Sequence, residues 1–495
     1  MKYALALDVG TTSLKGVLFD AHAGIAAAAL QEYELSKPKP DIVEMDAGIY
    51  WSAARRVIRK ILHQSRISPR RIISVGITSQ GETLLVLDKQ GRPLRKAIVW
   101  LDNRSGYEAD EIGRALGPDA IYRMTGQQEM IPTWTATRIL WLRRHEAAVF
   151  RKARKYLLAG DYLMYRLTGK YVTDRALNPS TLYFDIRKGE WWPAMLGFLG
   201  IDAAHLPALA DSGSAIGTVS PEAAAVTGLT ADTLVTTAPI DQIAGAIGAG
   251  NIAPGMITET TGAAMALCAC VKKPTYDPGR RVGLYCHALR GNYVLLPWAP
   301  VAGMALRWFR DELGGGLDYH ALCQAAGRVP PGADGLMIFP HLCGAGCPDV
   351  NPRAKGVFWG IALGHTRAHF TRAILEATAF MLKGNLELLN NLGFDAAEIR
   401  SLGGAARSDL WLQIKADVCG KRMLAMECAE TTCLGAAMLS FVGNGTYRNL
   451  AEAAARMVRV RRTIRPNPRS ARAYAGIYDR YCRCYDRMKG LFPLR

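Results

Sequence analysis

The amino-acid sequence predicts an α/β fold divided into two lobes. Strand-like and helix-like segments alternate along the chain, which is typical of α/β proteins. A strand–turn–strand element rich in Gly and Thr occurs twice, over 3–20 and over 257–271. The chain has 495 residues, which is too many for one hydrophobic core. We therefore expect two domains, 1–245 and 246–495, with one such element near the start of each.

The first half begins with a short hairpin and continues with alternating elements. Residues 49–64 carry Trp51, Ala54, Ile58 and Ile61 close to helical spacing, which favours an amphipathic helix. The apolar runs of this half predict strands over 3–7, 14–20, 71–78 and 84–87. The first turn, between 7 and 14, is small, polar and contains a glycine.

The second half of the chain repeats this alternation of strands, turns and helices. A strand is predicted over 233–239, just before Asp241, and a second strand–turn–strand over 257–271. A long helix fits 367–389. A strand over 399–402 leads through a glycine turn into a helix from Leu410. The tail from Arg465 returns to helical spacing with regular aromatic residues, and we expect it to cap the surface.

The composition excludes several classes of protein. Hydrophobic residues make up 49% and charged residues 21%, which excludes disordered and fibrous chains. No window offers the ~20 apolar residues of a membrane helix, and Asp8 comes too early for a secretion signal. The eleven cysteines lack the density of a disulfide scaffold and the spacing of zinc fingers. We expect free thiols, a cytoplasmic location and no membrane partner.

The charge is the one unusual figure. Lys and Arg number 61 against 43 Asp and Glu, a net charge of +18. These basic residues are scattered singly or in short clusters, many on predicted helix faces, and no nucleic-acid-binding signature accompanies them. We expect no nucleic-acid partner, although the charge alone would support one. It would suit anionic small ligands equally well.

The segment from Asp8 to Thr12 is a candidate phosphate site. A turn with a glycine and adjacent threonines presents N–H groups and hydroxyls to an anion. An aspartate just ahead of it can bind Mg²⁺, which uses few carboxylates together with phosphate oxygens. An ordinary β-turn is the alternative that the residues alone leave open.

Two further segments could carry chemistry. Gly403-Gly404-Ala405 follows a predicted strand and precedes a helix, which suits close approach of a nucleotide to the backbone, or simply a tight turn. Asp241 ends an apolar strand, where a lone carboxylate can act as a general base or as a helix N-cap. The residues alone do not choose between these alternatives.

Taken in order, several segments resemble the FGGY family of carbohydrate kinases, within the actin/hexokinase/Hsp70-like ATPase group. The most specific match is to the family's C-terminal signature: Gly356-x-Phe358-x-Gly360-Ile361, then seven residues, then His369-Phe370-x-x-Ala373-Ile374-Leu375-Glu376. The N-terminal signature is matched in its second half by Ile139-x-Trp141-Leu142-x-Arg144-His145, with Arg138 where the pattern has Lys. Family-like segments also occur at 97–104, 161–169 and 403–411. The resemblance implies two actin/hexokinase-like (ribonuclease H-like) domains with an interdomain cleft.

By this resemblance the chain is an ATP-dependent, Mg²⁺-requiring carbohydrate kinase. It implies Asp241 as the general base and Asp8 as the residue beside Mg²⁺. The implied contacts to ATP are Thr11, Thr12 and Lys15 in the first hairpin, Thr260, Thr261 and Gly262 in the second, and Gly403, Gly404, Ala405 and Ser408 at the adenine–ribose end.

The sugar side is implied by residues after the third strand and around Asp241, namely Gln80, Gly81, Glu82, Trp100 and Gln242. Glu82 and Gln242 resemble the residues that glycerol kinases have at these positions. Gly81 stands where glycerol kinases have an arginine. We expect this replacement to leave space for a substrate longer than glycerol. The rest of the chain resembles the xylulokinase branch, which favours a pentulose such as D-xylulose. Glycerol, another polyol, a sugar acid and a non-catalytic sugar-binding regulator stay open, as does assembly into a homodimer.

Overall fold

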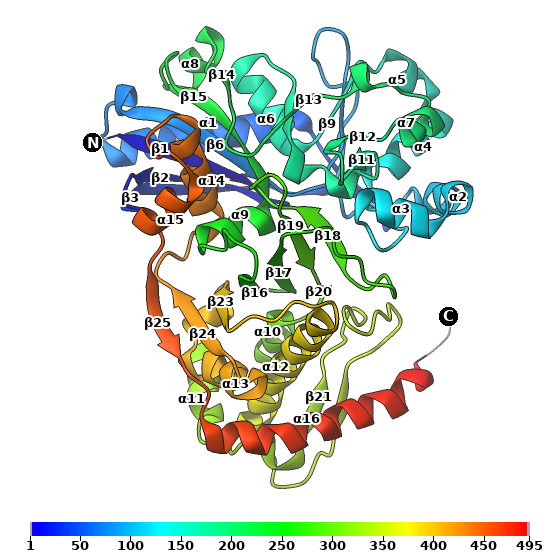
Figure 1. The fold of residues 1–495 in the computed structure, drawn as a ribbon, viewed down its shortest axis with the longest axis vertical. Helices are drawn as coiled ribbons and strands as arrows, with labels where there is room; N and C mark the ends of the chain where they lie inside the picture. The colour runs from blue at the N-terminus through cyan, green and yellow to red at the C-terminus, as the bar shows by residue number, and fades with distance from the viewer. Residues whose placement is uncertain (1, 493–495) are drawn as a thin grey trace.

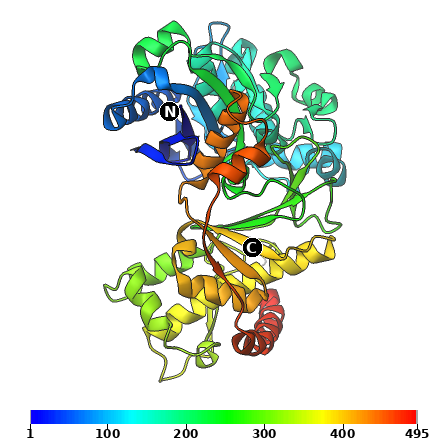
Figure 2. The same ribbon diagram turned by 60° about the vertical axis from the view of Figure 1, so that its left-hand side comes forward.

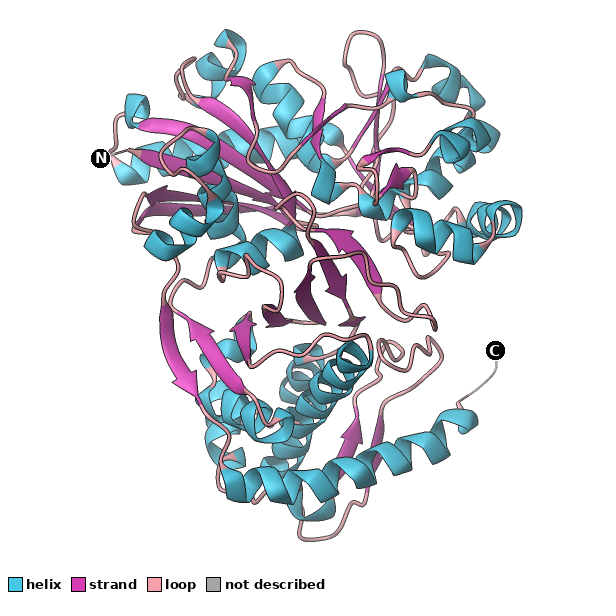
Figure 3. Cartoon of the chain, viewed as in Figure 1, coloured by secondary structure: helices cyan, strands magenta, loops and turns pink. Residues whose placement is uncertain are grey.

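A computed structural model describes residues 2–492 and shows two lobes, each built around one mixed β-sheet (Figures 1 and 3). The first sheet has six strands in the spatial order β14-β15-β6-β1-β2-β3. Its strands are β1 (Tyr3–Val9), β2 (Ser13–Asp20), β3 (Ile25–Glu32), β6 (Ile72–Ser79), β14 (Ala215–Thr218) and β15 (Leu234–Ile240). β1 pairs antiparallel with β2 and parallel with β6, and β6 pairs parallel with β15.

The second sheet repeats this arrangement. Its main order is β18-β19-β17-β16-β23-β24-β25, and β20 also pairs with β17. The strands are β16 (Ile257–Thr261), β17 (Met265–Val271), β18 (Gly283–Cys286), β19 (Tyr293–Leu296), β20 (Trp298–Ala299), β23 (Glu398–Leu402), β24 (Arg422–Met426) and β25 (Val460–Ile464). β16 pairs antiparallel with β17 and parallel with β23, as β1 does with β2 and β6. The two Gly- and Thr-rich elements therefore open two sheets of similar design.

Helices and short strands complete each lobe. Those of the first half are α1 (Ala47–Ser65), α2 (Gly106–Leu116), α3 (Pro118–Thr125), α4 (Thr135–His145), α5 (Ala147–Lys152), α6 (Ala159–Thr168), α7 (Pro193–Leu199), α8 (Pro221–Thr227), β4 (Ser36–Lys39), β5 (Ile42–Met45), β7 (Leu85–Leu87), β8 (Ala97–Ile98), β9 (Lys155–Leu157), β10 (Val172–Asp174), β11 (Phe184–Asp185), β12 (Glu190–Trp191) and β13 (Ala208–Ala210). Those after it are α9 (Asp241–Gly248), α10 (Gly303–Glu312), α11 (Tyr319–Ala326), α12 (Arg367–Asn391), α13 (Asp409–Cys419), α14 (Thr431–Gly443), α15 (Leu450–Met457), α16 (Pro468–Met488), β21 (Met337–Phe339) and β22 (Val357–Trp359).

The first sheet is covered on both faces, and alternation along β1 shows why. Leu5 and Leu7 join the core formed with α1, whereas Ala4 and Ala6 face the core formed with α14. The small alanines allow this helix to approach the sheet closely. Figures 1 and 2 show α14 and α15 beside the strands of the first lobe, although both helices come late in the chain. The domain boundary near residue 245 stays a prediction, and the first lobe includes these two helices.

The predicted elements agree closely with the observed ones. The long helix predicted over 367–389 is α12, and the tail helix is α16. The tail is more than a surface cap, because Tyr474, Tyr478, Tyr481 and Tyr485 are buried in the core of the second lobe. In the described part of the chain, no helix is long and apolar enough to cross a membrane.

Two helices from distant parts of the sequence meet at a pair of glycines. A Cβ atom on Gly435 of α14 would lie 1.9 Å from the carbonyl oxygen of Ala244 in α9. A Cβ on Gly248 of α9 would lie 1.9 Å from the carbonyl oxygen of Thr431 in α14. No side chain fits at either position, so the two backbones are in direct contact. We call this contact the α9–α14 crossing.

We predict that Gly435→Ala destabilises the protein. The added methyl must displace one helix backbone, and overpacking of this kind costs about 1–3 kcal/mol or more. The matched control is Gly476→Ala in α16, where a Cβ would have no neighbour within 4 Å, so its Tm should be unchanged or slightly raised. Thermal unfolding followed by circular dichroism measures both. Equal Tm values for the two variants would contradict the crossing.

Candidate active site

Three carboxylates come together at one edge of the first sheet. Asp8 lies near the end of β1, Glu82 follows β6, and Asp241 follows β15. Because β1, β6 and β15 are parallel neighbours, their carboxyl ends meet at the same edge. The side chain of Glu82 is buried, and those of Asp8 and Asp241 are partly buried. We call Asp8, Glu82 and Asp241 the carboxylate cluster.

The electrostatics of the cluster disfavour ionisation. Burial first, and then the nearby charge of Asp8, raises the pKa of Asp241 to about 8. Burial also raises the pKa of Asp8 to about 6, although the Lys15 ammonium opposes this shift. The pKa of Glu82 is raised by burial against the lowering effects of the Ser180 hydroxyl and Arg138. Three acids with raised pKa values at one sheet edge are a pattern typical of catalytic sites.

Asp241 is the first residue of α9 rather than its N-cap, which is Ile240. The N-cap alternative is therefore wrong. Its Oδ1 accepts a hydrogen bond from the backbone N–H of Gln242 at 2.7 Å. Gln242 is the second residue of this helix, and its side chain is exposed.

The first hairpin is bonded to two residues that are predicted to bind the sugar. Its turn closes by a bond from Gly10 N to Ser13 O at 2.9 Å. The Thr11 hydroxyl donates to Gln80 Oε1 at 3.0 Å and accepts from Trp100 Nε1 at 2.8 Å. Thr12 is exposed. Thr11 thus joins the hairpin to Gln80 and Trp100, while Thr12 is free to meet a ligand.

Lys15 of β2 lies opposite Asp8 in the β1–β2 pair. Its ammonium donates to Glu430 Oε2 at 2.7 Å, just before α14 begins. Burial lowers the pKa of Lys15, but the hydrogen bond and charge of Glu430 outweigh it and raise the pKa overall. The predicted ATP contact of Lys15 would therefore compete with this ion pair.

The second hairpin differs from the prediction in one respect. Thr260 and Thr261 lie within β16, and the turn consists of the residues that follow them. The Thr261 hydroxyl is buried; it donates to Glu259 Oε2 at 2.7 Å and accepts from Lys415 Nζ at 2.8 Å. Lys415 Nζ also pairs with Glu259 Oε1 at 2.7 Å. Strand alternation therefore turns the Thr261 hydroxyl into the lobe, whereas the implied contact of Thr261 with ATP stays a prediction.

The glycine turn after β23 lies against this hairpin. Gly403 has φ +78°, and a Cβ there would lie 2.7 Å from the carbonyl oxygen of Thr261. Gly403 and Gly404 are exposed, Ala405 is buried, and Ser408 caps α13 by accepting from Trp411 N at 3.3 Å. The structure therefore brings Gly262 and Gly403 side by side.

Gly81 lies against the end of the Ile240 side chain. A Cβ on Gly81 would lie 2.9 Å from Ile240 Cδ1 and 3.4 Å from Ser180 Oγ. A side chain here would therefore require Ile240 to shift. That Gly81 makes room for a substrate longer than glycerol stays a prediction.

A buried arginine joins the segments of Glu82 and Trp100, a role that the sequence motifs do not predict. Arg138 of α4 is fully buried. Its guanidinium donates to the carbonyl oxygens of Glu82 at 2.6 Å and of Trp100 at 2.8 Å. Burial lowers its pKa to about 10. The only sign of this role in the sequence is that Arg138 stands where the family's N-terminal signature has Lys. A guanidinium can hold two loops at once, which a lysine does less well.

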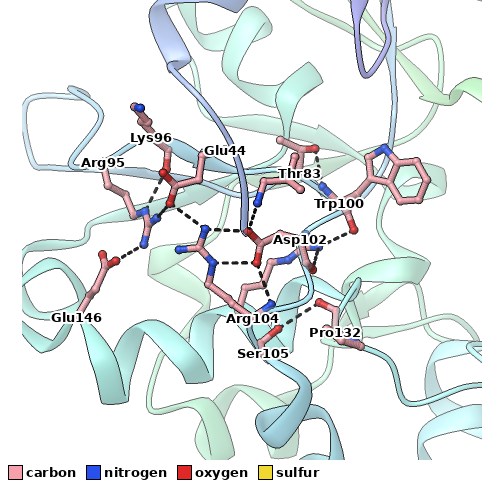
Figure 4. Close-up of polar contacts among 12 residues, drawn as sticks. Glu44, Thr83, Arg95, Lys96, Trp100, Asp102, Arg104, Ser105, Pro132 and Glu146 are labelled. Atoms are coloured by element: carbon pink, nitrogen blue, oxygen red, sulfur yellow. Dashed lines mark hydrogen bonds and ion pairs between the residues drawn. The ribbon is translucent and has the colours of Figure 1, made fainter. Parts of the chain in front are cut away.

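The loop that carries Trp100 contains a polar network around Asp102 and Arg104 (Figure 4). The buried Asp102 carboxylate accepts from Val43 N at 2.6 Å and from Arg104 Nε at 2.8 Å. Arg104 also donates to Glu44 at 2.8 Å. The Asp102 carboxylate and the Arg104 guanidinium, in the same loop as Trp100, thus bond to each other and to the segment of Val43 and Glu44.

Three further polar residues lie at or near the carboxylate cluster. Tyr285 of β18 lies near both Glu82 and Asp241, whose charges raise its pKa together with burial. Gln127 lies beside Tyr285, and its buried amide atoms have no hydrogen-bond partner among residues 2–492. Ser180, beside Glu82, is likewise buried, and its hydroxyl lowers the pKa of that carboxyl. No sequence motif marks these residues, because distant segments of the chain bring them together.

The raised pKa of Asp241 predicts a pH-dependent gain in stability for Asp241→Asn. An acid with a folded pKa above its unfolded value destabilises the fold progressively as pH rises from about 4 to about 8. Asparagine removes this penalty, so the Tm advantage over wild type should be small at pH 5 and largest above pH 8. Differential scanning calorimetry across this range measures it. The control, Asp110→Asn at an exposed site in α2, should show no comparable rise; an advantage that shrinks with pH would contradict the assigned pKa.

Comparison with known proteins identifies the fold and the family. Residues 3–248 match the N-terminal domain, and residues 261–443 the C-terminal domain, of the FGGY family of carbohydrate kinases. The chain is 28% identical over 491 residues to xylulose kinase of Bacillus subtilis (strain 168), covering 99% of this chain and 98% of that one. It is 30% identical over 456 residues to gluconokinase of Bacillus licheniformis, covering 90% and 88%.

Solved structures agree with these relatives. The ligand-bound xylulose kinase from Lactobacillus acidophilus superposes with a TM-score of 0.92 at 25% identity, and 99% of each chain is covered. The expected actin/hexokinase-like fold is thereby confirmed. The two lobes, the paired hairpins and the matches along both halves lead to one conclusion: this chain belongs to the FGGY family of carbohydrate kinases.

Proposed function

We propose that this carbohydrate kinase transfers the γ-phosphoryl group of ATP to a terminal hydroxyl of a pentulose, with D-xylulose as the first choice. The observation that carries the proposal is the carboxylate cluster, with Asp241 at its edge and a pKa of about 8. Phosphoryl transfer needs positioning, charge neutralisation and a carboxylate that accepts the proton of the attacking hydroxyl. Asp241 is our candidate for that general base.

A pKa near 8 suits a general base. Catalysis by proton transfer is most efficient when the pKa of the base lies near the working pH. At neutral pH an appreciable fraction of Asp241 is ionised, and its ionised form accepts a proton readily. Asp241 is the first residue of α9, directly after β15, so its carboxylate lies at the edge of the first sheet.

Asp8 fits the Mg²⁺ that accompanies ATP in this proposal. Its buried Oδ1 has no hydrogen-bond partner within residues 2–492, so a hard oxygen ligand is left unused there. In the same range, no three His, Cys, Asp or Glu side chains form a metal-binding group. That agrees with Mg²⁺, which uses one or two carboxylates together with phosphate oxygens. Bound Mg²⁺ would neutralise phosphate charge; the protein's own part is to hold the Asp8 carboxylate in place.

ATP is proposed to lie between the two hairpins. Thr12 with Thr11 in the first hairpin, and Thr260 with Gly262 in the second, would present hydroxyls and backbone N–H groups to the phosphates. Gly403, Gly404, Ala405 and Ser408 would line the adenine–ribose end, where the close contact of Gly403 with the second hairpin supports the arrangement. Lys15 would contribute if its bond to Glu430 were exchanged for a phosphate.

The sugar is proposed to bind among polar side chains that border the carboxylate cluster. Glu82, Gln80, Trp100 and Gln242 come from the family resemblance, and the backbone of Gly81 borders them. Gln127 adds buried amide atoms that have no hydrogen-bond partner within residues 2–492, and Ser180 adds a buried hydroxyl. A buried polar atom without a partner costs about 1–3 kcal/mol, which a sugar hydroxyl would recover. This supports a substrate with several hydroxyls.

The same polar groups could also bind substrates other than a pentulose. The similarity to a gluconokinase supports a sugar acid as the second candidate. Glycerol, another polyol and a regulator that binds sugar without turnover stay as further alternatives. The cytoplasmic location and the homodimer stay predictions.

We predict that Asp241→Asn lowers kcat at least ~100-fold, the usual scale for loss of a general base. Asparagine keeps the shape but cannot accept the proton, so binding of sugar and nucleotide should persist. Steady-state kinetics gives kcat, and calorimetric titration gives the two affinities. Asp110→Asn is the control and should turn over normally. Near-normal turnover in Asp241→Asn would refute the assignment of the base.

A second prediction concerns substrate choice. In a coupled ADP-release assay with xylulose, ribulose, glycerol, erythritol, fuculose and gluconate, kcat/KM should be highest for a pentulose. We expect kcat/KM for the pentulose to exceed that for the other substrates at least about tenfold. A substrate that leaves one buried polar group of the site unpaired loses about that factor in kcat/KM. A preference for gluconate or glycerol would contradict the pentulose proposal. Absence of sugar-dependent turnover across the panel would favour a non-catalytic regulator.

A further inference from the structure

A second cavity, of about 200 Å³, lies between the two lobes and outside the carboxylate cluster. One wall is the turn between β11 and β12, which belongs to the first lobe. The opposite wall is the turn between β18 and β19, which belongs to the second. Arg175 and Asp211 complete the lining from the first lobe. We call this cavity the interlobe pocket.

The interlobe pocket is strongly basic. Its lining includes Arg175, Arg187, Lys188 and Arg290 against the single carboxylate of Asp211. The exposed side chains of Arg187 and Lys188 form no ion pair or hydrogen bond within residues 2–492. Asp185 lies beneath their turn, where its Oδ1 accepts from the backbone N–H groups of Arg187 at 3.0 Å and Lys188 at 3.1 Å. Two cations are thus held at the rim without a counter-ion.

Asp211 orders the other two cations. Arg175 Nε lies 2.9 Å from Asp211 Oδ1, and Arg290 Nη1 lies 3.6 Å from Asp211 Oδ2. Arg175 comes from the first lobe and Arg290 from the second, so this carboxylate brings one guanidinium from each lobe to the same place. Two guanidinium groups held in this way are suited to binding a planar or tetrahedral oxyanion.

The pocket is distinct from the site of the carboxylate cluster. Tyr285 of β18 lies near Glu82 and Asp241, whereas the next residue, Cys286, lines the interlobe pocket. Successive side chains of a strand point to opposite faces. The two sites therefore lie on opposite faces of β18, separated by one strand.

We propose that the interlobe pocket binds a small phosphate-bearing anion. A volume of about 200 Å³ is below the usual size of sites for drug-sized ligands, which favours free phosphate or a small phosphorylated sugar. A ligand that contacts Arg187 and Lys188 on one side and Arg290 on the other bridges the lobes. It therefore binds this lobe arrangement better than a more open one and stabilises it. The proposal does not depend on the substrate or the catalytic base proposed above.

Calorimetric titration of the full chain tests this site, with inorganic phosphate in one arm and ribose 5-phosphate in the other. A saturating non-hydrolysable ATP analogue with Mg²⁺ keeps the nucleotide site from contributing. The variant R187A/K188A should weaken binding at least ~10-fold, because two charge-assisted contacts are lost. The matched control R59A/K60A removes an adjacent exposed Arg–Lys pair from α1, so it changes the net charge equally.

The two arms identify the ligand, since the tighter-binding probe shows whether the sugar portion is also recognised. R290A, on the opposite lobe, should also weaken binding, which confirms the bridging geometry even if R187A/K188A folds poorly. Equal affinities for R187A/K188A and R59A/K60A would overturn the proposal. So would equal losses in both, because they would show attraction by net charge alone.

Discussion

The α9–α14 crossing is the contact on which the geometry of the site depends. Gly248 and Gly435 let two helix backbones touch, although the helices are almost two hundred positions apart in sequence. α9 begins at Asp241, and α14 begins after Glu430, whose carboxylate pairs with Lys15 opposite Asp8. One close approach therefore sets both the position of the candidate base and the ion pair beside the first hairpin. A side chain at either glycine would push these groups apart.

The carboxylate cluster has a cost in stability that the surrounding structure offsets. Burial raises the pKa values of Asp8, Glu82 and Asp241, and the charges of Asp8 and Glu82 raise that of Asp241 further. The apolar core around Ala4 and Ala6, shared by the first sheet, α9 and α14, keeps the cluster together. Such strain at a site is expected where function, rather than stability, selects the residues. In the proposed complex, sugar hydroxyls that donate to the carboxylates, and Mg²⁺ beside Asp8, would favour their ionised forms.

Much of the fold follows from local patterns in the sequence, whereas the roles of side chains follow only in part. The Asp8–Thr12 turn and the strand before Asp241 were predicted because they depend on neighbouring residues. The buried direction of the Thr261 hydroxyl depends on strand register and on Lys415, which lies far along the chain. The space beside Gly81 depends on Ile240 in the same way. Contacts of this kind are set by tertiary packing, so no local pattern reveals them.

The most direct test of the account is a structure of the protein with the sugar and a non-hydrolysable ATP analogue bound. The account predicts that the attacking hydroxyl of the sugar lies within about 3.2 Å of an Asp241 oxygen. It also predicts that this hydroxyl faces the γ-phosphate, and that the nucleotide lies between the hairpins at Thr12 and Gly262. A sugar bound away from Asp241, or a γ-phosphate on the far side of the carboxylate cluster, would contradict it.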